Sequence, residues 1–167
     1  MTFVPEYYFK TFNEVRAEFL LSIGIKGILL DIDNTLEPYE HPTPGEHVVA
    51  WFSELNALGI SAAFVSNNNR QRVSLFNESL HFPAYSKAGK PFKKNLLNAM
   101  KDLGTDATNT IFMGDQIFTD VLAAHNAGIP AILVPPINDK KDLFTKFKRV
   151  LEKPFLKKYF KNKEKGR

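Results

Sequence analysis

Short apolar runs alternate along this chain with stretches whose apolar residues recur at helical spacing, and this alternation strongly constrains the fold. Strands are expected over residues 27–32, 60–65, 84–85, 110–113 and 131–134. Helices, several of them closed by a glycine, are expected over residues 44–58, 70–80, 91–103 and 119–126. Strands and helices that alternate at this spacing are typical of a parallel sheet with helices on both faces. We therefore expect an α/β protein of three layers.

Length and composition suit a single globular domain covering residues 1–167. Hydrophobic residues make up 44% of the chain and charged residues 24%, which is ordinary usage for a protein with a packed core. The sequence contains no cysteine, which excludes disulfides, cysteine-ligated zinc and thiol catalysis within this chain. Neither a signal peptide nor an apolar run of about 18 residues is visible, so we expect a soluble, cytoplasmic protein.

The net charge of +4 is unevenly distributed. Residues 139–167 carry twelve lysines and arginines against four acidic residues, whereas the rest of the chain carries ten basic and fourteen acidic residues. A basic C-terminal tail from about residue 152 is typical of a segment that meets an anionic surface, either lipid or nucleic acid. A solvated terminal helix explains the same composition equally well.

Polar residues follow three of the expected strands at the point where each strand ends. Asp31 and Asp33 follow the first strand, Ser66 and Asn67 the second, and Asp115 the fourth. Ligands of an open parallel sheet bind beyond the carboxyl ends of its strands, so we expect these side chains to converge. Paired carboxylates after an apolar run favour a bound Mg²⁺, although a D-x-D sequence alone is more often an ordinary strand end.

Four motifs in this order resemble those of the haloacid-dehalogenase-like (HAD) phosphatases. Residues 30–36 (L-D-I-D-N-T-L) are similar to the first motif, D-x-D-x-T, and Ser66 with Asn67 resembles the second, a strand that ends in a phosphate-binding hydroxyl. Lys90-Pro91 resembles the third motif, and residues 114–120 (G-D-Q-I-F-T-D) match the G-D-x-x-x-x-D form of the fourth. The resemblance implies a Rossmann-like HAD core and a phosphoric monoester hydrolase.

The same resemblance implies a role for each acidic residue. Asp31 is expected to be the nucleophile that forms an aspartyl-phosphate, and Asp33 the general acid and base. Mg²⁺ is expected to be held by Asp31, by Asp33 through its backbone carbonyl, and by Asp115. Asp120 is expected either to hold the metal or to hold Lys90 in place.

Phosphate is expected to be bound by Ser66, Asn67 and Lys90. Ser66 offers a hydroxyl donor and Lys90 a positive charge, where negative charge develops in the transition state. Lys87 is an alternative to Lys90, which we prefer because Pro91 suits the first position of a helix. Asn67 is equally well explained as an ordinary turn residue.

Further detail lies in residues 24–27 (G-I-K-G) leading into D-I-D-N-T-L, and in residues 66–68 (S-N-N) and 114–116 (G-D-Q) downstream. These segments resemble the YqeG family of small bacterial phosphatases, which is related to the phosphatidylglycerophosphate phosphatases. Only 34 residues separate Asp31 from Ser66, and 23 separate Ser66 from Lys90, which leaves no room for a cap domain. An open site favours a large substrate, and with the basic tail we expect phosphatidylglycerophosphate at the inner face of an anionic membrane. The alternatives are a nucleic-acid end, a phosphoprotein, or a non-catalytic basic binding module.

Overall fold

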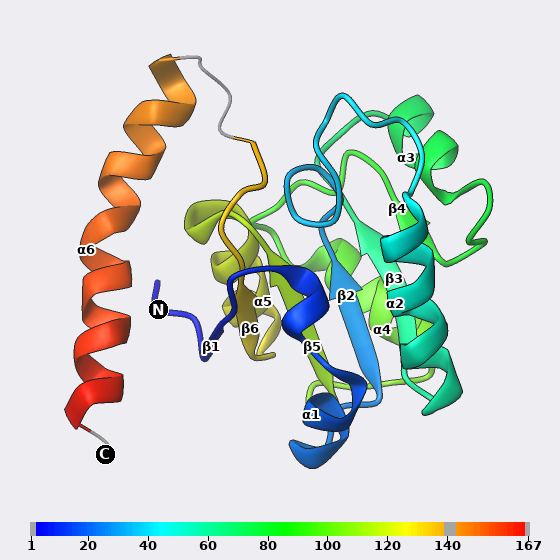
Figure 1. The fold of residues 1–167 in the computed structure, drawn as a ribbon, viewed down its shortest axis with the longest axis horizontal. Helices are drawn as coiled ribbons and strands as arrows, with labels where there is room; N and C mark the ends of the chain where they lie inside the picture. Colours follow the sequence, from blue (N-terminus) through cyan, green and yellow to red (C-terminus); the bar gives the residue numbers. More distant parts are fainter. Residues whose placement is uncertain (1–2, 139–142, 166–167) are drawn as a thin grey trace.

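A parallel sheet of six strands forms the centre of the molecule (Figure 1). The computed structural model describes the backbone of residues 3–138 and 143–165 and the side chains of residues 3–138 and 150–163. The strands are β1 (Tyr7–Tyr8), β2 (Gly27–Leu30), β3 (Ser61–Val65), β4 (Ala84–Tyr85), β5 (Thr110–Gly114) and β6 (Ala131–Leu133). Their order across the sheet is β1-β6-β5-β2-β3-β4, and every neighbouring pair is parallel. The carboxyl ends of all six strands therefore lie at one edge, here called the carboxyl edge.

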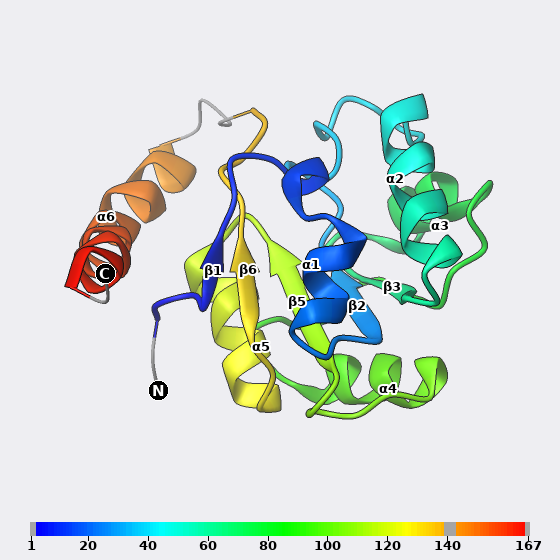
Figure 2. The ribbon, with the colours of Figure 1, turned by 60° about the horizontal axis from the view of Figure 1, so that its bottom comes forward.

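Helices cover both faces of this sheet, which confirms the expected α/β/α architecture (Figure 2). The elements between the strands are η1 (Phe12–Glu14), α1 (Ala17–Ser22), α2 (Glu46–Ala57), α3 (Arg70–Asn77), α4 (Lys94–Leu103), the π-helical turn η2 (Ile117–Val121) and α5 (Leu122–Ala127). A long helix, α6 (Leu143–Lys165), follows β6. None of the helices in the described part of the chain is long and apolar enough to cross a bilayer.

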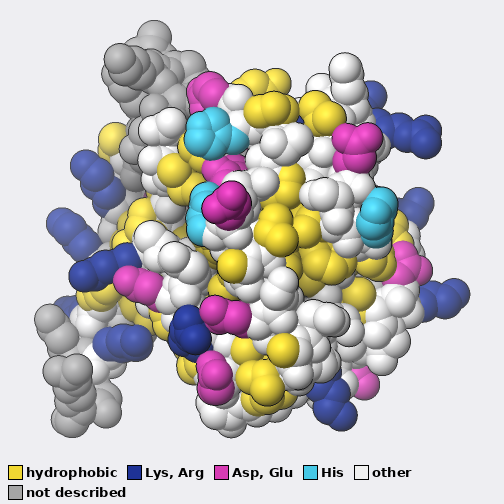
Figure 3. All heavy atoms as spheres, turned by 45° about the vertical axis from the view of Figure 1, so that its right-hand side comes forward, with side chains coloured by type: hydrophobic (Ala, Val, Ile, Leu, Met, Phe, Trp, Pro, Cys, Tyr) yellow, Lys and Arg dark blue, Asp and Glu magenta, His cyan; other side chains and the backbone are white. Residues whose placement is uncertain are grey.

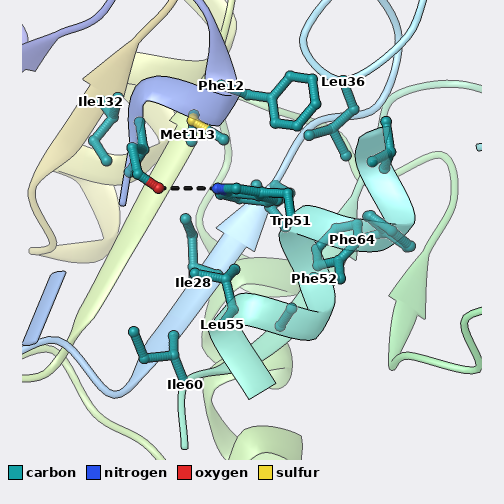
Figure 4. Packing of buried hydrophobic residues seen from close by; sticks show 14 of the residues in the cluster. Phe12, Ile28, Leu36, Trp51, Phe52, Leu55, Ile60, Phe64, Met113 and Ile132 are labelled. Atoms are coloured by element: carbon teal, nitrogen blue, oxygen red, sulfur yellow. Dashed lines mark hydrogen bonds between the residues drawn. The ribbon is translucent and has the colours of Figure 1, made fainter. Parts of the chain in front are cut away.

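Alternate residues of the central strands divide between two hydrophobic clusters, as the pleat of a strand requires. Ile28 and Leu30 of β2 pack with one cluster, and Leu29 packs with the other. Trp51 of α2 belongs to the first cluster, and its indole Nε1 donates a hydrogen bond of 2.9 Å to the backbone oxygen of Val15 (Figure 4). This bond ties α2 to the segment that joins η1 and α1.

The N-terminal strand β1 adds to the expected elements, whereas α6 is the C-terminal helix considered from the sequence. β1 is an edge strand paired with β6, and α6 lies beside it (Figures 1 and 2). Phe155 of α6 packs against Phe3 with ring centroids 5.0 Å apart, and Tyr159 is buried beside Tyr8. The part of the tail after residue 152 is therefore amphipathic, with an inner face packed on the body of the protein.

Candidate active site

The first two candidate residues, Asp31 and Asp33, lie in the loop that follows β2. Asp31 continues the line of β2, because its backbone N–H donates to Met113 of β5 at 3.0 Å, and its side chain is buried. The chain then turns sharply at Asn34, whose φ of 63° lies in the left-handed region that asparagine tolerates. The backbone N–H of Asn34 donates to the oxygen of Glu37 at 2.7 Å, which closes the turn.

Three buried carboxylates meet at the carboxyl edge of the sheet. Asp31, Asp115 and Asp120 each offer an oxygen within 4.8 Å of the others. Asp115 follows β5, and the hydroxyl of Thr35 lies 3.5 Å from its Oδ1. Asp120 lies in η2, and its Oδ2 accepts the backbone N–H of Gln116 at 3.0 Å. Of the four aspartates expected to hold the metal, these three are therefore brought together through their side chains.

Lys90 is the cation that contacts this group. Its Nζ lies 2.9 Å from Asp31 Oδ1 and 2.7 Å from Asp120 Oδ1, and its side chain is buried. Lys87, the alternative considered from the sequence, has an exposed side chain and a backbone φ of 46°. The geometry therefore places Lys90 among the aspartates.

Helix α4 begins at Lys94, so the expectation that Pro91 opens the helix is wrong. A turn precedes the helix instead, closed by a 2.9 Å bond from the Phe92 N–H to the Gly89 oxygen.

Ser66 and Asn67 lie where β3 ends, beside the lysine. Ser66 is buried, and its Oγ accepts the backbone N–H of Asn68 at 3.1 Å. The side-chain amide of Asn67 pairs with the backbone of Lys90, accepting its N–H at 2.8 Å and donating to its oxygen at 3.1 Å. In this arrangement Asn67 holds the backbone of Lys90. A direct contact of Asn67 with phosphate remains a prediction.

Asp33 is not one of the three clustered carboxylates, and its carboxyl group is bound by residues at the start of α3 and in the loop before it. Its Oδ1 accepts Arg72 Nε at 2.9 Å, and its Oδ2 accepts Asn68 Nδ2 at 2.9 Å. Sequence analysis missed Arg72 and Asn68 as site residues. A signal for the arginine was present, because Arg72 shares the apolar stripe of α3 with Val73 and Phe76, where a charged residue needs a buried partner.

Burial and the neighbouring charges together shift the pKa values of Asp31 and Lys90. Burial raises the pKa of Asp31 to about 6, and the charge of Asp120 adds to this rise while Lys90 opposes it. Burial alone would lower the pKa of Lys90, but Asp120 and Asp31 outweigh it and raise that pKa. Lys90 is therefore positively charged across the physiological range, and one lysine faces three carboxylates.

This donor set fits a hard divalent cation. Carboxylate oxygens are the ligands that Mg²⁺ prefers, and one ammonium does not neutralise three carboxylates. Asp31, Asp115 and Asp120 are the residues that could hold the ion through their side chains.

Comparisons with known proteins agree with this geometry. Residues 87–145 match the HAD-hydrolase-like family model. The chain is 35% identical over 154 residues to the probable phosphatase YqeG of Bacillus subtilis, covering 92% of this chain and 90% of that protein. The chain belongs to the YqeG family of HAD phosphatases. It is therefore a phosphoric monoester hydrolase, and the activity expected from its motifs is confirmed at this level.

Solved structures show the same fold at low sequence identity. The cobalt-bound deoxy-D-mannose-octulosonate 8-phosphate phosphatase of Haemophilus influenzae aligns with a TM-score of 0.54 and 17% identity, over 75% of each chain. The thermostable NPPase of Geobacillus stearothermophilus aligns with a TM-score of 0.53 and 16% identity, over 71% of this YqeG-family chain and 94% of that one. These two likenesses support the HAD core fold.

Gly114 offers a test of the placement of Asp120. A Cβ built on Gly114 would overlap the carboxyl group of Asp120, so Gly114→Ala must displace that side chain. Because small displacements of catalytic groups are costly, we expect phosphatase kcat/KM to fall by about 100-fold. Far-ultraviolet circular dichroism and urea unfolding would show that the fold persists. An unchanged kcat/KM in the folded variant would contradict this placement of Asp120.

The raised pKa of Asp31 predicts a pH dependence of stability in the absence of divalent cations. The folded protein binds the Asp31 proton more tightly than the unfolded chain, so this contribution is present at about pH 4 and is lost as the pH rises through about 6. Asp31→Asn lacks this titration. In EDTA, the free energy of unfolding of the wild type relative to Asp31→Asn should therefore fall by on the order of 2–3 kcal/mol between about pH 4 and pH 7.

Urea unfolding of both proteins across this pH range measures the difference. A difference that stays constant or rises with pH would show that Asp31 has no raised pKa.

Proposed function

We propose that this phosphatase depends on Mg²⁺ and works through an aspartyl-phosphate on Asp31. The observation that carries the proposal is the contact of buried Lys90 with Asp31 and Asp120, in a group that also includes Asp115. A phosphate dianion would be repelled by these carboxylates. A bound Mg²⁺ supplies charge neutralisation for the phosphoryl group and the nucleophile, which is the chemistry that this acidic group lacks on its own.

In the first step, an oxygen of Asp31 attacks phosphorus and forms a new O–P bond. The bond from phosphorus to the leaving oxygen breaks, and that oxygen keeps the electron pair and takes a proton from the Asp33 carboxyl group. Lys90 and the hydroxyl of Ser66 face the phosphoryl group, where negative charge accumulates. Lys90 also fixes the attacking carboxylate, because its Nζ lies 2.9 Å from Asp31 Oδ1.

In the second step, the Asp33 carboxylate takes a proton from water, and the water oxygen attacks phosphorus. The bond between Asp31 and phosphorus breaks, which releases inorganic phosphate and restores the Asp31 carboxylate. Asp33 needs access to both the leaving group and the water, and its side chain is 16% exposed, whereas that of Asp31 is 10% exposed. Its position at the rim of the three-carboxylate group suits this exchange.

The substrate we propose is phosphatidylglycerophosphate, presented at the inner face of the membrane. The described chain between Asp31 and Ser66 consists of a loop, α2 and β3, and that between Ser66 and Lys90 of α3 and β4 with their loops. Neither segment contains a cap domain, so the carboxyl edge can accept a phosphate attached to a large body. A nucleic-acid end or a phosphoprotein is the alternative of the same class, whereas membership in a phosphatase family favours an enzyme over a binding module.

The basic tail supports peripheral contact with an anionic membrane. Lysines at 153, 157, 158, 161 and 163 are exposed on α6, and Figure 3 shows basic side chains along this side of the molecule. The side chains of Lys146, Lys148 and Arg149 lie outside the described residues. On the opposite face of α6, Glu152 accepts the N–H of Ile117 at 2.9 Å. Because η2 begins at Ile117 and carries Asp120, the inner face of the helix also supports the site.

Phosphate release from vesicles tests the proposed reaction and substrate. With Mg²⁺, the wild type should hydrolyse phosphatidylglycerophosphate in mixed vesicles, and EDTA should abolish turnover. Asp31→Asn should lose activity by at least about a thousandfold while remaining folded, as circular dichroism would show. Lys87→Ala should retain most activity, and Lys90→Ala should not. Turnover of soluble phosphoesters without turnover of the lipid would overturn the substrate and leave the chemistry intact.

The contribution of the tail to membrane binding is best tested by neutralising lysines of α6. Deleting residues 152–167 would also remove the contacts of Glu152, Phe155 and Tyr159 with the rest of the protein. Lys157→Gln with Lys158→Gln should weaken binding to anionic vesicles by about 1 kcal/mol for each lysine. Lys26→Gln with Lys101→Gln removes the same charge from exposed positions elsewhere and is the matched control. Equal binding by the two double variants in a cosedimentation assay would rule out a specific role for α6.

A further inference from the structure

Arg72 is a buried cation placed against the proposed general acid and base. Only 8% of the residue is exposed, and two of its guanidinium nitrogens, Nε and Nη2, lie 2.9 Å from Asp33 Oδ1. The other oxygen of Asp33 accepts Asn68 Nδ2 at 2.9 Å. Both oxygens of the carboxylate are therefore fixed from the α3 side, which leaves Asp33 one orientation in this structure.

Arg72 is itself held from several directions. Its Nη1 donates to the backbone oxygen of Pro42 at 2.8 Å, and its backbone N–H donates to the Asn69 side chain at 2.9 Å. The guanidinium carbon lies 5.3 Å from the ring centroid of Phe76 and 5.9 Å from that of Tyr39. A planar fork held between a helix and a loop has little rotational freedom. The fixed guanidinium of Arg72 therefore also fixes the orientation of the Asp33 carboxylate that it binds.

We propose that Arg72 is a positioning residue that acts on catalysis through Asp33, without touching the substrate. The proposal deepens the proposed function and rests on the acid and base role of Asp33. Without Arg72, the Asp33 carboxylate would keep Asn68 as its polar partner and would lie near a group of three other carboxylates. Proton transfer needs the carboxyl group within hydrogen-bond reach of the leaving oxygen, so a freely rotating Asp33 would be productive for only part of the time.

A purely structural role is the competing explanation. Arg72 joins α3 to the loop at Pro42, and it could simply staple this loop to the fold. In that case, loss of the arginine would lower kcat/KM by the same factor for every substrate. The same factor would also apply on top of the decrease in kcat/KM caused by Asp33→Asn. The two explanations therefore differ in how the effect depends on the leaving group and on Asp33.

The first measurement compares kcat/KM of Arg72→Gln for two soluble substrates, an alkyl phosphate and dinitrophenyl phosphate. This constant reports only the steps up to departure of the leaving group, and a dinitrophenolate departs without a proton. We expect a loss of about 10–100-fold for the alkyl phosphate, which is no more than the lower end of the roughly 100- to 10,000-fold contribution of general acid catalysis, and less than about threefold for the aryl phosphate. Arg70→Gln, an exposed arginine on the same helix, should change neither value. Equal losses for both substrates would overturn the proposal.

The second measurement is a double-mutant cycle with Asp33→Asn on the alkyl phosphate. If Arg72 acts through Asp33, then adding Arg72→Gln to Asp33→Asn should cost less than about twofold more, because there is no acid left to position. A further loss as large as that in the wild-type background would contradict the proposal. If Asp33→Asn alone showed no preference for the aryl substrate, then the acid role of Asp33 would fail, and with it the proposed mechanism.

Two further variants apply if Arg72→Gln does not fold. Arg72→Lys keeps the charge but cannot bind Asp33 and the Pro42 oxygen in the same fork, so it should show a smaller loss confined to the alkyl substrate. Asn68→Ala frees the other oxygen of Asp33 and should show the same selectivity while leaving Arg72 in place. Losses shared equally by the two substrates in both variants would overturn the positioning role.

Discussion

The ammonium of Lys90, lying between Asp31 and Asp120, is the interaction on which the site depends. Three carboxylates are buried at the end of a parallel sheet, and their mutual repulsion would be severe without a cation. Lys90 relieves part of it and keeps its own charge because of these neighbours. Burial, together with the charge of Asp120, explains why the pKa of Asp31 is raised. The negative charge that Lys90 leaves uncompensated explains why the site suits a divalent cation.

The fold places these groups by bringing the ends of neighbouring strands together. β2 lies between β5 and β3 in the sheet, so residues that follow these three strands meet at the carboxyl edge. The elements around the edge then fix individual groups: Asn67 holds the backbone of Lys90, Arg72 holds Asp33, and Glu152 holds the start of η2. Two of these three residues, Arg72 and Glu152, lie outside the motif positions, so part of the precision of the site comes from elsewhere in the chain.

Sequence patterns predicted the sheet and the convergence of Asp31, Asp115 and Asp120, for reasons of spacing. Buried strands such as residues 27–30 are short apolar runs, and the polar residues that follow them mark the carboxyl edge. Contacts between distant segments were not accessible in this way. The pairing of Arg72 with Asp33, 39 residues apart, depends on how α3 packs, and the short edge strand β1 has no periodicity to detect. The start of α4 was placed too early, because a turn follows Pro91 where a helix was expected.

The most direct test of this account is to locate the phosphoryl group during turnover. Acid quenching of the enzyme with radiolabelled substrate and Mg²⁺, followed by borohydride reduction and peptide mass spectrometry, identifies an acyl phosphate and its position. The account predicts labelled wild-type protein with reduction at Asp31, and no label in Asp31→Asn. Label on another side chain, or rapid turnover with no trapped phosphoenzyme in the wild type under quench conditions that preserve acyl phosphates, would contradict it.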